Sequence, residues 1–325
     1  MVIVKQGHFV PVCYLNEFAS YGKISVYDKS KLETRTNQSP KEIAKQRYFY
    51  DFSEDELVSL KELYPEIDKQ FIEKFLSKNI EPCLKECLKT IHSYYLEDND
   101  EYNYLLSKAF KKNISLQMAY QFLRTRGLRE KISFVKKDRQ SLVQKLLLLD
   151  GNAINNLADF FYSKKWIINI NKTQVPYYTS DNPVVVLDIN SNVLSIDALK
   201  SAGIKLIQYP YSSSISLSLL DENLSEALND LAIERLEVTN KYEVDYCNSL
   251  QIRNATMHVF FSGDQIEKSC LDLLNPLKEK YLEEKWAAEL EKQLMSNFNM
   301  LRTGNIDNDE LAKSIQILKK ILKDI

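Results

Sequence analysis

Glycine and proline are scarce in this chain, with 7 glycines and 8 prolines among 325 residues. Tight turns depend on these two residue types, so an architecture of many short strands joined by turns is disfavoured. No apolar run approaches the roughly 20 residues of a membrane-spanning helix, and the apolar start before Lys5 is too short for a signal peptide. We therefore expect no membrane partner.

Cysteine and histidine are also rare, with 5 cysteines and 3 histidines. The cysteine number is odd and the spacing gives no disulfide framework, so we expect free thiols and a cytoplasmic location. Cys83, Cys87 and His92 lie close in the sequence, but on a helix His92 projects about 180° away from Cys83. This geometry argues against a zinc site. Glycine-rich phosphate loops and nucleophile elbows are absent from the sequence.

The residues that are abundant favour helices. Hydrophobic residues make up 44% and charged residues 27% of the chain, which is the composition of a globular protein, and leucine, isoleucine, lysine and glutamate are good helix formers. Ser53 and Glu56 have the spacing of a capping box. Ser39 and Pro40 are typical of a helix start. Apolar spacing predicts further helices over 66–96, with a kink or break at Pro82, and over 102–130 and 140–162.

Short β-rich stretches follow the helical region and also precede it. Strands are predicted over 23–27, 165–170, 183–187, 214–219 and 259–261. Helices are predicted again over 224–236, 271–297 and 308–324. The fold class is therefore expected to be α+β, predominantly helical with a small mixed or antiparallel β-sheet.

The domain organisation is expected to be one α+β core domain over residues 1–262. Its predicted parts are an N-terminal β-containing lobe at 1–52, a helical region at 53–162 and a β-rich region at 163–220, and a C-terminal helical extension at 265–325 packs on the core. The last predicted helix carries a stripe of Leu311, Ile315, Leu318 and Leu322. This stripe is either core or the seam of a homodimer.

Positive charge is concentrated between Lys111 and Lys145, where ten Lys and Arg residues face only Glu130 and Asp138. Such a segment attracts phosphates and therefore suggests a nucleic acid or nucleotide partner. The alternative is a pair of solvated basic helices balanced by acidic neighbours.

A polar turn precedes the predicted strand at 183–187. Thr179 to Pro183 places small hydrogen-bonding residues directly before the apolar residues. In one interpretation Ser180 and Asp181 build the turn by binding the backbone. In the other, Asp181 is a carboxylate held at a strand end, ready to bind a cation or a donor.

Two glutamines and an arginine share one face of the predicted helix at 102–130. Gln117, Gln121 and Arg124 lie within about 60° of one another on a helical wheel. A solvent-facing position in this chain would more naturally carry lysine or glutamate. Planar, multidentate groups of this kind suit a phosphate or a base edge, although a solvent face is the other interpretation.

His8 is followed by an apolar run near the start of the chain, and Arg47 and Tyr50 lie in a basic and aromatic stretch at 45–52. A histidine beside aromatic residues is either a satisfied core group or an acid–base group. The other two histidines, His92 and His258, have less context and are interpreted as structural.

These stretches, in this order, resemble the bacterial family known as domain of unknown function 4238. The residues that carry the resemblance are His8, Val10, Pro11, Tyr14, Leu15, Phe18, Tyr27, Asp28, Pro40, Ala44, Phe49, Tyr50, Gln121, Arg124, Thr125, Arg129, Trp166, Thr179 to Pro183, and Tyr209 to Leu219. The resemblance covers most of residues 7–220 and continues more loosely to about 262. Many members have a doubled histidine where this chain has Gly7 and His8. The resemblance implies no activity, but it places His8, Gln121, Arg124 and Asp181 in the family pattern.

The leading hypothesis is an intracellular bacterial enzyme that acts on a phosphate-containing substrate, in its most concrete form an antiviral defence nuclease. His8 would be the general acid or base. Arg124, helped by Arg129, would neutralise the phosphate. Asp181 would hold a divalent cation such as Mg²⁺ or orient His8. The groups expected to bind the substrate are Gln121, Arg129, Ser180, Arg47 and Tyr50.

The alternative hypothesis is a non-catalytic binding or sensor module for a small anion, a nucleotide or a protein partner. An enzyme should bring Asp181 and His8 into one cleft. A binding module should show Arg124 and Gln121 converging without a carboxylate–histidine pair.

Overall fold

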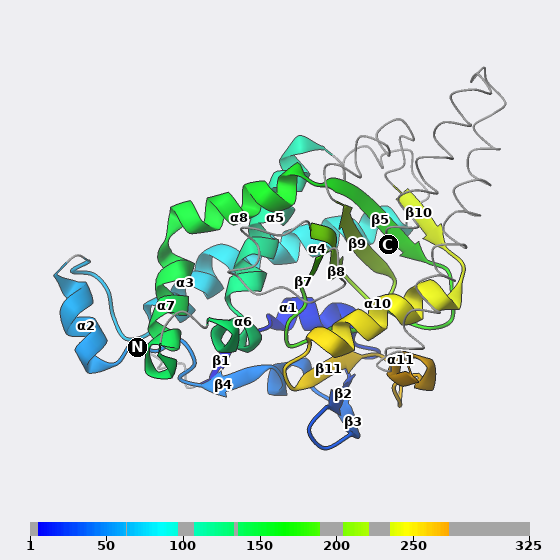
Figure 1. Ribbon diagram of the computed structural model, residues 1–325, viewed down its shortest axis with the longest axis horizontal. Coiled ribbons are helices and arrows are strands. Elements are labelled where there is room, and N and C mark those ends of the chain that lie inside the picture. Colours follow the sequence, from blue (N-terminus) through cyan, green and yellow to red (C-terminus); the bar gives the residue numbers. More distant parts are fainter. Residues whose placement is uncertain are drawn as a thin grey trace.

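The computed structural model describes residues 6–62, 64–96, 107–132, 136–188, 204–220 and 235–272. Of these residues about 49% are in helices and about 23% are in strands, and the strands form three sheets, of two, four and five strands. The protein is a mixed α+β fold (Figure 1), so the expectation of a predominantly helical fold with one small sheet was wrong. Several strands are short or polar, and such strands carry little of the apolar alternation by which a sequence reveals them.

The first helices begin where their capping residues predict. Ser53 begins α2 (Glu54–Lys61) with the predicted capping box, in which the Ser53 side chain accepts from the Glu56 N–H. A longer helical run then comprises α3 (Phe71–Phe75), a π-helical turn η3 (Leu76–Ile80) and α4 (Glu81–Leu96). This run starts later than predicted, and its irregular turn lies just before Pro82.

Four further helices form the rest of the helical layer: α5 (Lys108–Leu123), α6 (Arg126–Lys131), α7 (Lys137–Leu149) and α8 (Gly151–Ser163). The sequence predicts two long helices here, but each is split by a capping residue. Thr125 accepts from the Leu128 N–H and starts α6, and Asp150 accepts from two N–H groups and starts α8. A side chain that binds these free donors begins a new helix. As a result α8 packs along α5 (Figure 1).

The five-stranded sheet has the order β10-β5-β9-β8-β7. Its strands are β5 (Lys165–Asn171), β7 (Val185–Asp188), β8 (Ile204–Pro210), β9 (Ile215–Leu220) and β10 (Arg235–Val238). All pairs are antiparallel except β10 with β5. One apolar cluster joins this sheet to the helices, and it includes Trp166 and Leu217 from the strands and Met118 and Phe161 from α5 and α8.

The four-stranded sheet, with the order β3-β2-β11-β6, joins the two ends of the described chain. It contains β2 (Ile24–Asp28), β3 (Glu33–Gln38), β6 (Thr179–Ser180) and β11 (His258–Phe261). β11 pairs antiparallel with both β2 and β6. The strands predicted over 23–27, 165–170, 183–187, 214–219 and 259–261 are thus confirmed to within about two residues.

A buried helix, α10 (Lys241–Asn254), lies against the four-stranded sheet and was not predicted. The last two residues of the helix predicted over 224–236 instead belong to β10, which covers residues 235–238. Polar residues are buried along α10 together with apolar ones, so the helix lacks the one-sided apolar pattern that prediction relies on.

The remaining short elements are α1 (Val12–Leu15), η1 (Asn16–Phe18), η2 (Pro40–Glu42), α11 (Lys268–Asp272) and the two strands of the smallest sheet, β1 (Gln6–His8) and β4 (Lys45–Arg47). The predicted helices beyond residue 272, and with them the apolar stripe at 311–322, lie outside the described residues. Within the described ranges no helix combines the length and the apolar character needed to cross a bilayer.

Candidate functional site

The N-terminal segment is anchored to α5 by the two polar residues that the sequence singled out. The Arg124 Nη2 donates to the main-chain oxygen of His8 at 2.6 Å, and the Gln121 Nε2 donates to the main-chain oxygen of Phe9 at 3.4 Å. Gln121 and Arg124 therefore do converge. The groups on which they converge, however, are carbonyl oxygens of their own chain.

Arg124 is the centre of this region. Its side chain is only 2% exposed, and Nη2 also donates to Glu81 Oε1 at 2.9 Å. The hydroxyl of the buried Tyr50 donates to the Arg124 carbonyl at 2.8 Å. Burial by itself lowers the pKa of a guanidinium, but Tyr50 and Glu81 more than offset it and hold the pKa of Arg124 above its usual value. Arg124 is therefore a permanently charged, buried group.

A second carboxylate, Glu73, lies close enough to Arg124 for the charge of the arginine to lower its pKa, and it belongs to the same helical run as Glu81. Eight residues correspond to about 2.2 turns of a regular α-helix, which would separate the two side chains by about 80°. The π turn at 76–80 takes up one additional residue, so eight residues make about two turns and both carboxylates lie on the same side. Pro82 has no N–H to donate to the carbonyl four residues earlier, which favours an irregular turn at this place.

The pKa of Glu73 is raised from its ordinary value to about 7. Burial is the main cause; the charge of Arg124 opposes it, and the carboxylates of Glu81 and Asp51 add to it. The Oε2 atom of Glu73 is buried and has no hydrogen-bond partner among the described residues. A Cβ atom on Gly7 would lie 2.8 Å from this oxygen. The glycine therefore provides the space that the Glu73 carboxyl occupies.

His8 lies at the edge of this cluster, on β1 opposite Lys45 of β4. Its ring is half-buried, and Nε2 is 3.2 Å from the Lys41 carbonyl oxygen. Burial lowers the pKa of His8 below 6.5; the Lys41 carbonyl and Glu81 oppose this effect, and the charges of Arg124 and Lys45 add to it. The imidazole is therefore neutral near pH 7. When Nε2 carries the ring proton and donates a hydrogen bond to the Lys41 carbonyl oxygen, Nδ1 is left as the basic nitrogen.

Asp181 is held by a different segment of the chain, the residues at 256–258. It is 1% exposed, and its carboxylate accepts three hydrogen bonds, from the N–H groups of Thr256, Met257 and His258. Burial raises the pKa of Asp181, whereas the three N–H groups and His258 lower it. The structure thus does not bring Asp181 into the His8 cluster.

The polar turn around Asp181 is held by α10, which sequence reasoning missed. Ser180 donates to Gln251, Gln251 donates to the Pro183 carbonyl, and Asn254 and Asn182 each donate to the other's carbonyl oxygen. Asn182 also accepts from the Gly127 N–H. Three amide residues of α10 at spacings of three, Asn248, Gln251 and Asn254, provide most of these bonds. That spacing was a usable signal in the sequence.

The predicted divalent cation does not fit these residues. Within the described ranges, His, Cys, Asp and Glu side chains form no group of three or more that could hold a metal ion. The carboxylate of Asp181, the predicted ligand, is buried and occupied by backbone donors. We therefore derive no step through a metal.

Much of the basic segment at 111–145 is used inside the protein. Arg129 donates to Gln144 and to the Phe49 carbonyl, and its guanidinium stacks 3.6 Å from the centre of the Phe49 ring. Lys145 forms a buried 2.6 Å ion pair with Glu56. Together with Arg124, these cations serve the fold. Arg47, by contrast, is exposed.

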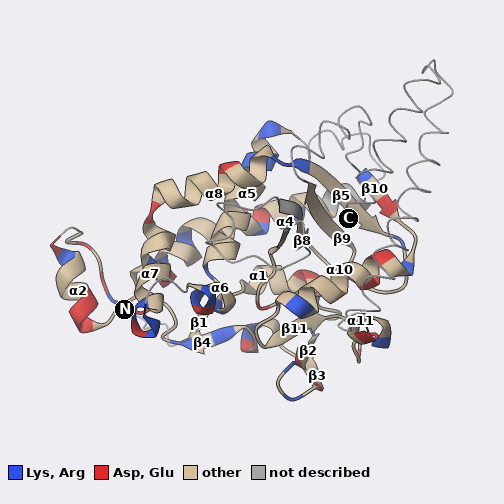
Figure 2. Cartoon of the chain, in the orientation of Figure 1, with Lys and Arg blue, Asp and Glu red and all other residues tan. Residues whose placement is uncertain are grey.

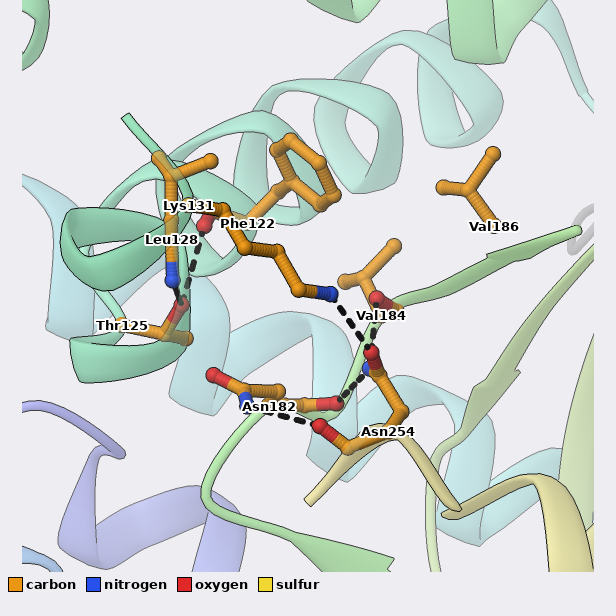
Figure 3. A pocket seen from close by; sticks show the side chains of 8 residues that line it. All are labelled: Phe122, Thr125, Leu128, Lys131, Asn182, Val184, Val186 and Asn254. Atoms are coloured by element: carbon orange, nitrogen blue, oxygen red, sulfur yellow. Dashed lines mark hydrogen bonds between the residues drawn. The ribbon is translucent and has the colours of Figure 1, made fainter. Parts of the chain in front are cut away.

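A small pocket lies between α6, the start of β7 and the end of α10 (Figure 3). Lys131 points into it and donates to Asn254 Oδ1 at 3.3 Å. The space open to the centre of a water molecule is about 20 Å³, which is room for one or two waters. The pocket is therefore too small for a nucleotide.

No curated protein and no solved structure matches the chain. One family model matches over residues 6–147 and 142–265, a span that includes His8, Arg124 and Asp181. The expected resemblance is confirmed: the chain belongs to the family described as protein of unknown function, DUF4238.

Proposed function

We propose that the protein is a hydrolase of phosphate-containing substrates, with nucleic acid as the substrate class and His8 as the group that exchanges the proton. The observation that carries the proposal is the position of the His8 ring, which is half-buried, contacts the Lys41 carbonyl through Nε2 and lies beside the Arg124–Glu81 ion pair. Burial lowers the pKa of His8 below 6.5, so the ring is able to accept a proton near neutral pH.

In the proposed reaction, His8 removes a proton from water while the water oxygen bonds to phosphorus. The bond from phosphorus to the leaving oxygen breaks, and this oxygen takes a proton from solvent. Arg124 does not touch the phosphate in this scheme, because its side chain is buried and bound to Glu81 and to the His8 carbonyl. It acts as a positioning residue that holds both His8 and Glu81.

The test uses the purified protein with a panel of substrates: single-stranded DNA, duplex DNA, RNA and a small phosphodiester. His8→Gln is expected to reduce kcat/KM by about 10²- to 10⁴-fold. The matched control is His92→Gln, because His92 is an exposed histidine on α4. The wild-type rate should fall as the pH drops through the pKa of His8, which lies below 6.5. Turnover at the wild-type rate by His8→Gln would overturn the assignment.

A non-catalytic anion-binding module is the second candidate. The burial of Arg124 favours it, because Gln121 and Arg124 donate to main-chain oxygens inside the protein and do not contact a transition state there. In this case the wild-type protein binds oligonucleotides without cleaving any member of the panel. That result would overturn the hydrolase proposal.

A further inference from the structure

The short strand β4 is bounded at both ends by residues with a left-handed backbone. Ala44 has φ 49° and Tyr48 has φ 55°. A bulky aromatic residue rarely adopts this conformation, and where it does the surrounding structure must compensate for the strain. Such strained residues are enriched at ligand-binding sites. Here the strain occurs on the strand that pairs with His8.

The side chain of Tyr48 is presented to solvent close to two cations. Tyr48 is 42% exposed. The Arg47 guanidinium lies 4.9 Å from the ring centre, and Arg47 Nη2 donates to the Tyr48 hydroxyl at 3.1 Å. The Lys69 Nζ lies 6.0 Å from the same ring centre, which is near the outer limit of a cation–π contact. Lys69 can therefore give way to a flat ligand at little cost.

The charge around this tyrosine is mainly positive. Blue marks β4 at the lower edge of the molecule (Figure 2). Two carboxylates lie nearby: Glu42 pairs with Lys45, and Asp51 interacts electrostatically with Lys69. Among the described residues no carboxylate is within ion-pair distance of Arg47 or Lys69, so both charges are available to an anion.

The position of Tyr48, directly after β4, relates it to the proposed reaction. Lys45 is the residue opposite His8, and Tyr48 comes three residues later. At about 3.3 Å per residue, the tyrosine lies roughly 10 Å along the chain from the point opposite His8. A nucleotide chain can span this distance with a base at Tyr48 and a phosphate group near Lys45 and His8.

We propose that Tyr48, Arg47 and Lys69 form a platform on which a base of single-stranded nucleic acid stacks while the two cations contact its phosphates. The ring of an exposed tyrosine offers a π-face to any unpaired base, and duplex bases are already stacked on one another. This inference deepens the proposed function and rests on it for the reaction that follows binding. Binding itself is measured separately.

The experiment measures the affinity of a fluorescent single-stranded oligothymidylate in a His8→Gln background, in which the ligand is not degraded. Tyr48→Leu is expected to weaken binding about five- to 150-fold, and Tyr48→Phe to retain it, because stacking requires only the ring. The matched control is Tyr21→Leu, since Tyr21 is 103% exposed and also has a positive φ, 50°. Circular dichroism verifies that each variant is folded.

An abasic oligonucleotide of equal length separates stacking from charge. Tyr48→Leu should not change its binding, whereas Arg47→Gln and Lys69→Gln should each reduce the salt dependence by about 0.7 in the slope of log K against log salt. Equal binding of oligothymidylate by Tyr48→Leu and the parent overturns the platform, and so does an equal loss for the abasic ligand. A failed hydrolysis assay with Tyr48-dependent binding would reject the proposed function alone.

Discussion

The surroundings of Arg124 and those of Asp181 are built differently, although both residues are buried and both belong to the family pattern. Around Asp181 no buried polar atom of Ser180, Asn182, Gln251 or Asn254 lacks a partner. Around Arg124, three buried atoms have no partner among the described residues: Arg124 Nε, Gln121 Oε1 and Glu73 Oε2. Complete networks specify a fold, and incomplete ones in native proteins call for an explanation by water, ligand or chemistry. The bonds around Asp181 thus connect segments of the fold, and the Arg124 region is the better candidate for function.

The largest effect is expected from Arg124→Ala. The substitution leaves Glu81 without its cation and the His8 carbonyl without its donor, so unfolding should become easier by about 3–5 kcal/mol. Urea denaturation measures this change. Arg139→Ala is the control. Arg139 is exposed, and its ion pair with Asp138 is long, at 4.0 Å, and also exposed. Its loss should therefore change stability by less than about 0.5 kcal/mol. A similarly small effect at Arg124 would remove it from the centre of the cluster.

Asp181→Asn should cost about 2–3 kcal/mol of stability, because an amide NH₂ group would then face main-chain donors that now bind a charged acceptor. Denaturation of this variant and of the exposed control Asp138→Asn measures the difference. The folded Asp181→Asn protein should retain the hydrolysis and oligonucleotide binding of the parent. Loss of turnover with intact folding would break the contrast between the two regions and return Asp181 to the active centre.

The raised pKa of Glu73 predicts a pH-dependent stability. Below about pH 4.5 the carboxyl is protonated in both the folded and the unfolded chain. As the pH rises to about 7, the unfolded chain releases the proton and the folded chain retains it, so stability falls across this window and is level above it. Glu73→Gln should remove this fall, which amounts to about 3 kcal/mol for a shift from 4.5 to about 7. Unfolding curves at several pH values compare it with Glu54→Gln on α2, and parallel pH profiles for all three proteins would contradict the assignment.

Gly7→Ala should have the smallest effect, a loss of about 1 kcal/mol. The new methyl group displaces the flexible end of Glu73, and the Tyr50 ring, whose Cδ2 would lie 3.3 Å away, needs to move by only a few tenths of an ångström. As the Glu73 carboxyl moves out of its buried position, its pKa should fall and the pH dependence of stability should flatten. Gly151→Ala is the control, since a Cβ there meets nothing within 4 Å. A pH profile for Gly7→Ala identical to the parent would show that Gly7 does not position Glu73.

Some features could be predicted from the sequence because they depend on neighbours in the chain. The capping box at Ser53 and the strands at 165–170 and 214–219 are local patterns and were confirmed. The shared face of Gln121 and Arg124 follows from helical spacing, and both residues do bind the same segment. The sequence did not predict that Glu73 and Glu81 belong to the candidate site. Glutamates in a helix rich in lysine and glutamate resemble a solvent-exposed face, and only the π turn at 76–80 brings these two side chains to the same side.

By itself, then, the sequence determined several of the local elements, the absence of any long apolar run, and the residue types available for chemistry. The tertiary structure decided which partner each polar group has: Asp181 meets the N–H groups at 256–258, and Arg124 meets Glu81 and the His8 carbonyl. The physical reason is that these partners are distant in the chain. A buried charge takes the donors and acceptors that folding brings to it, and local spacing does not contain that information.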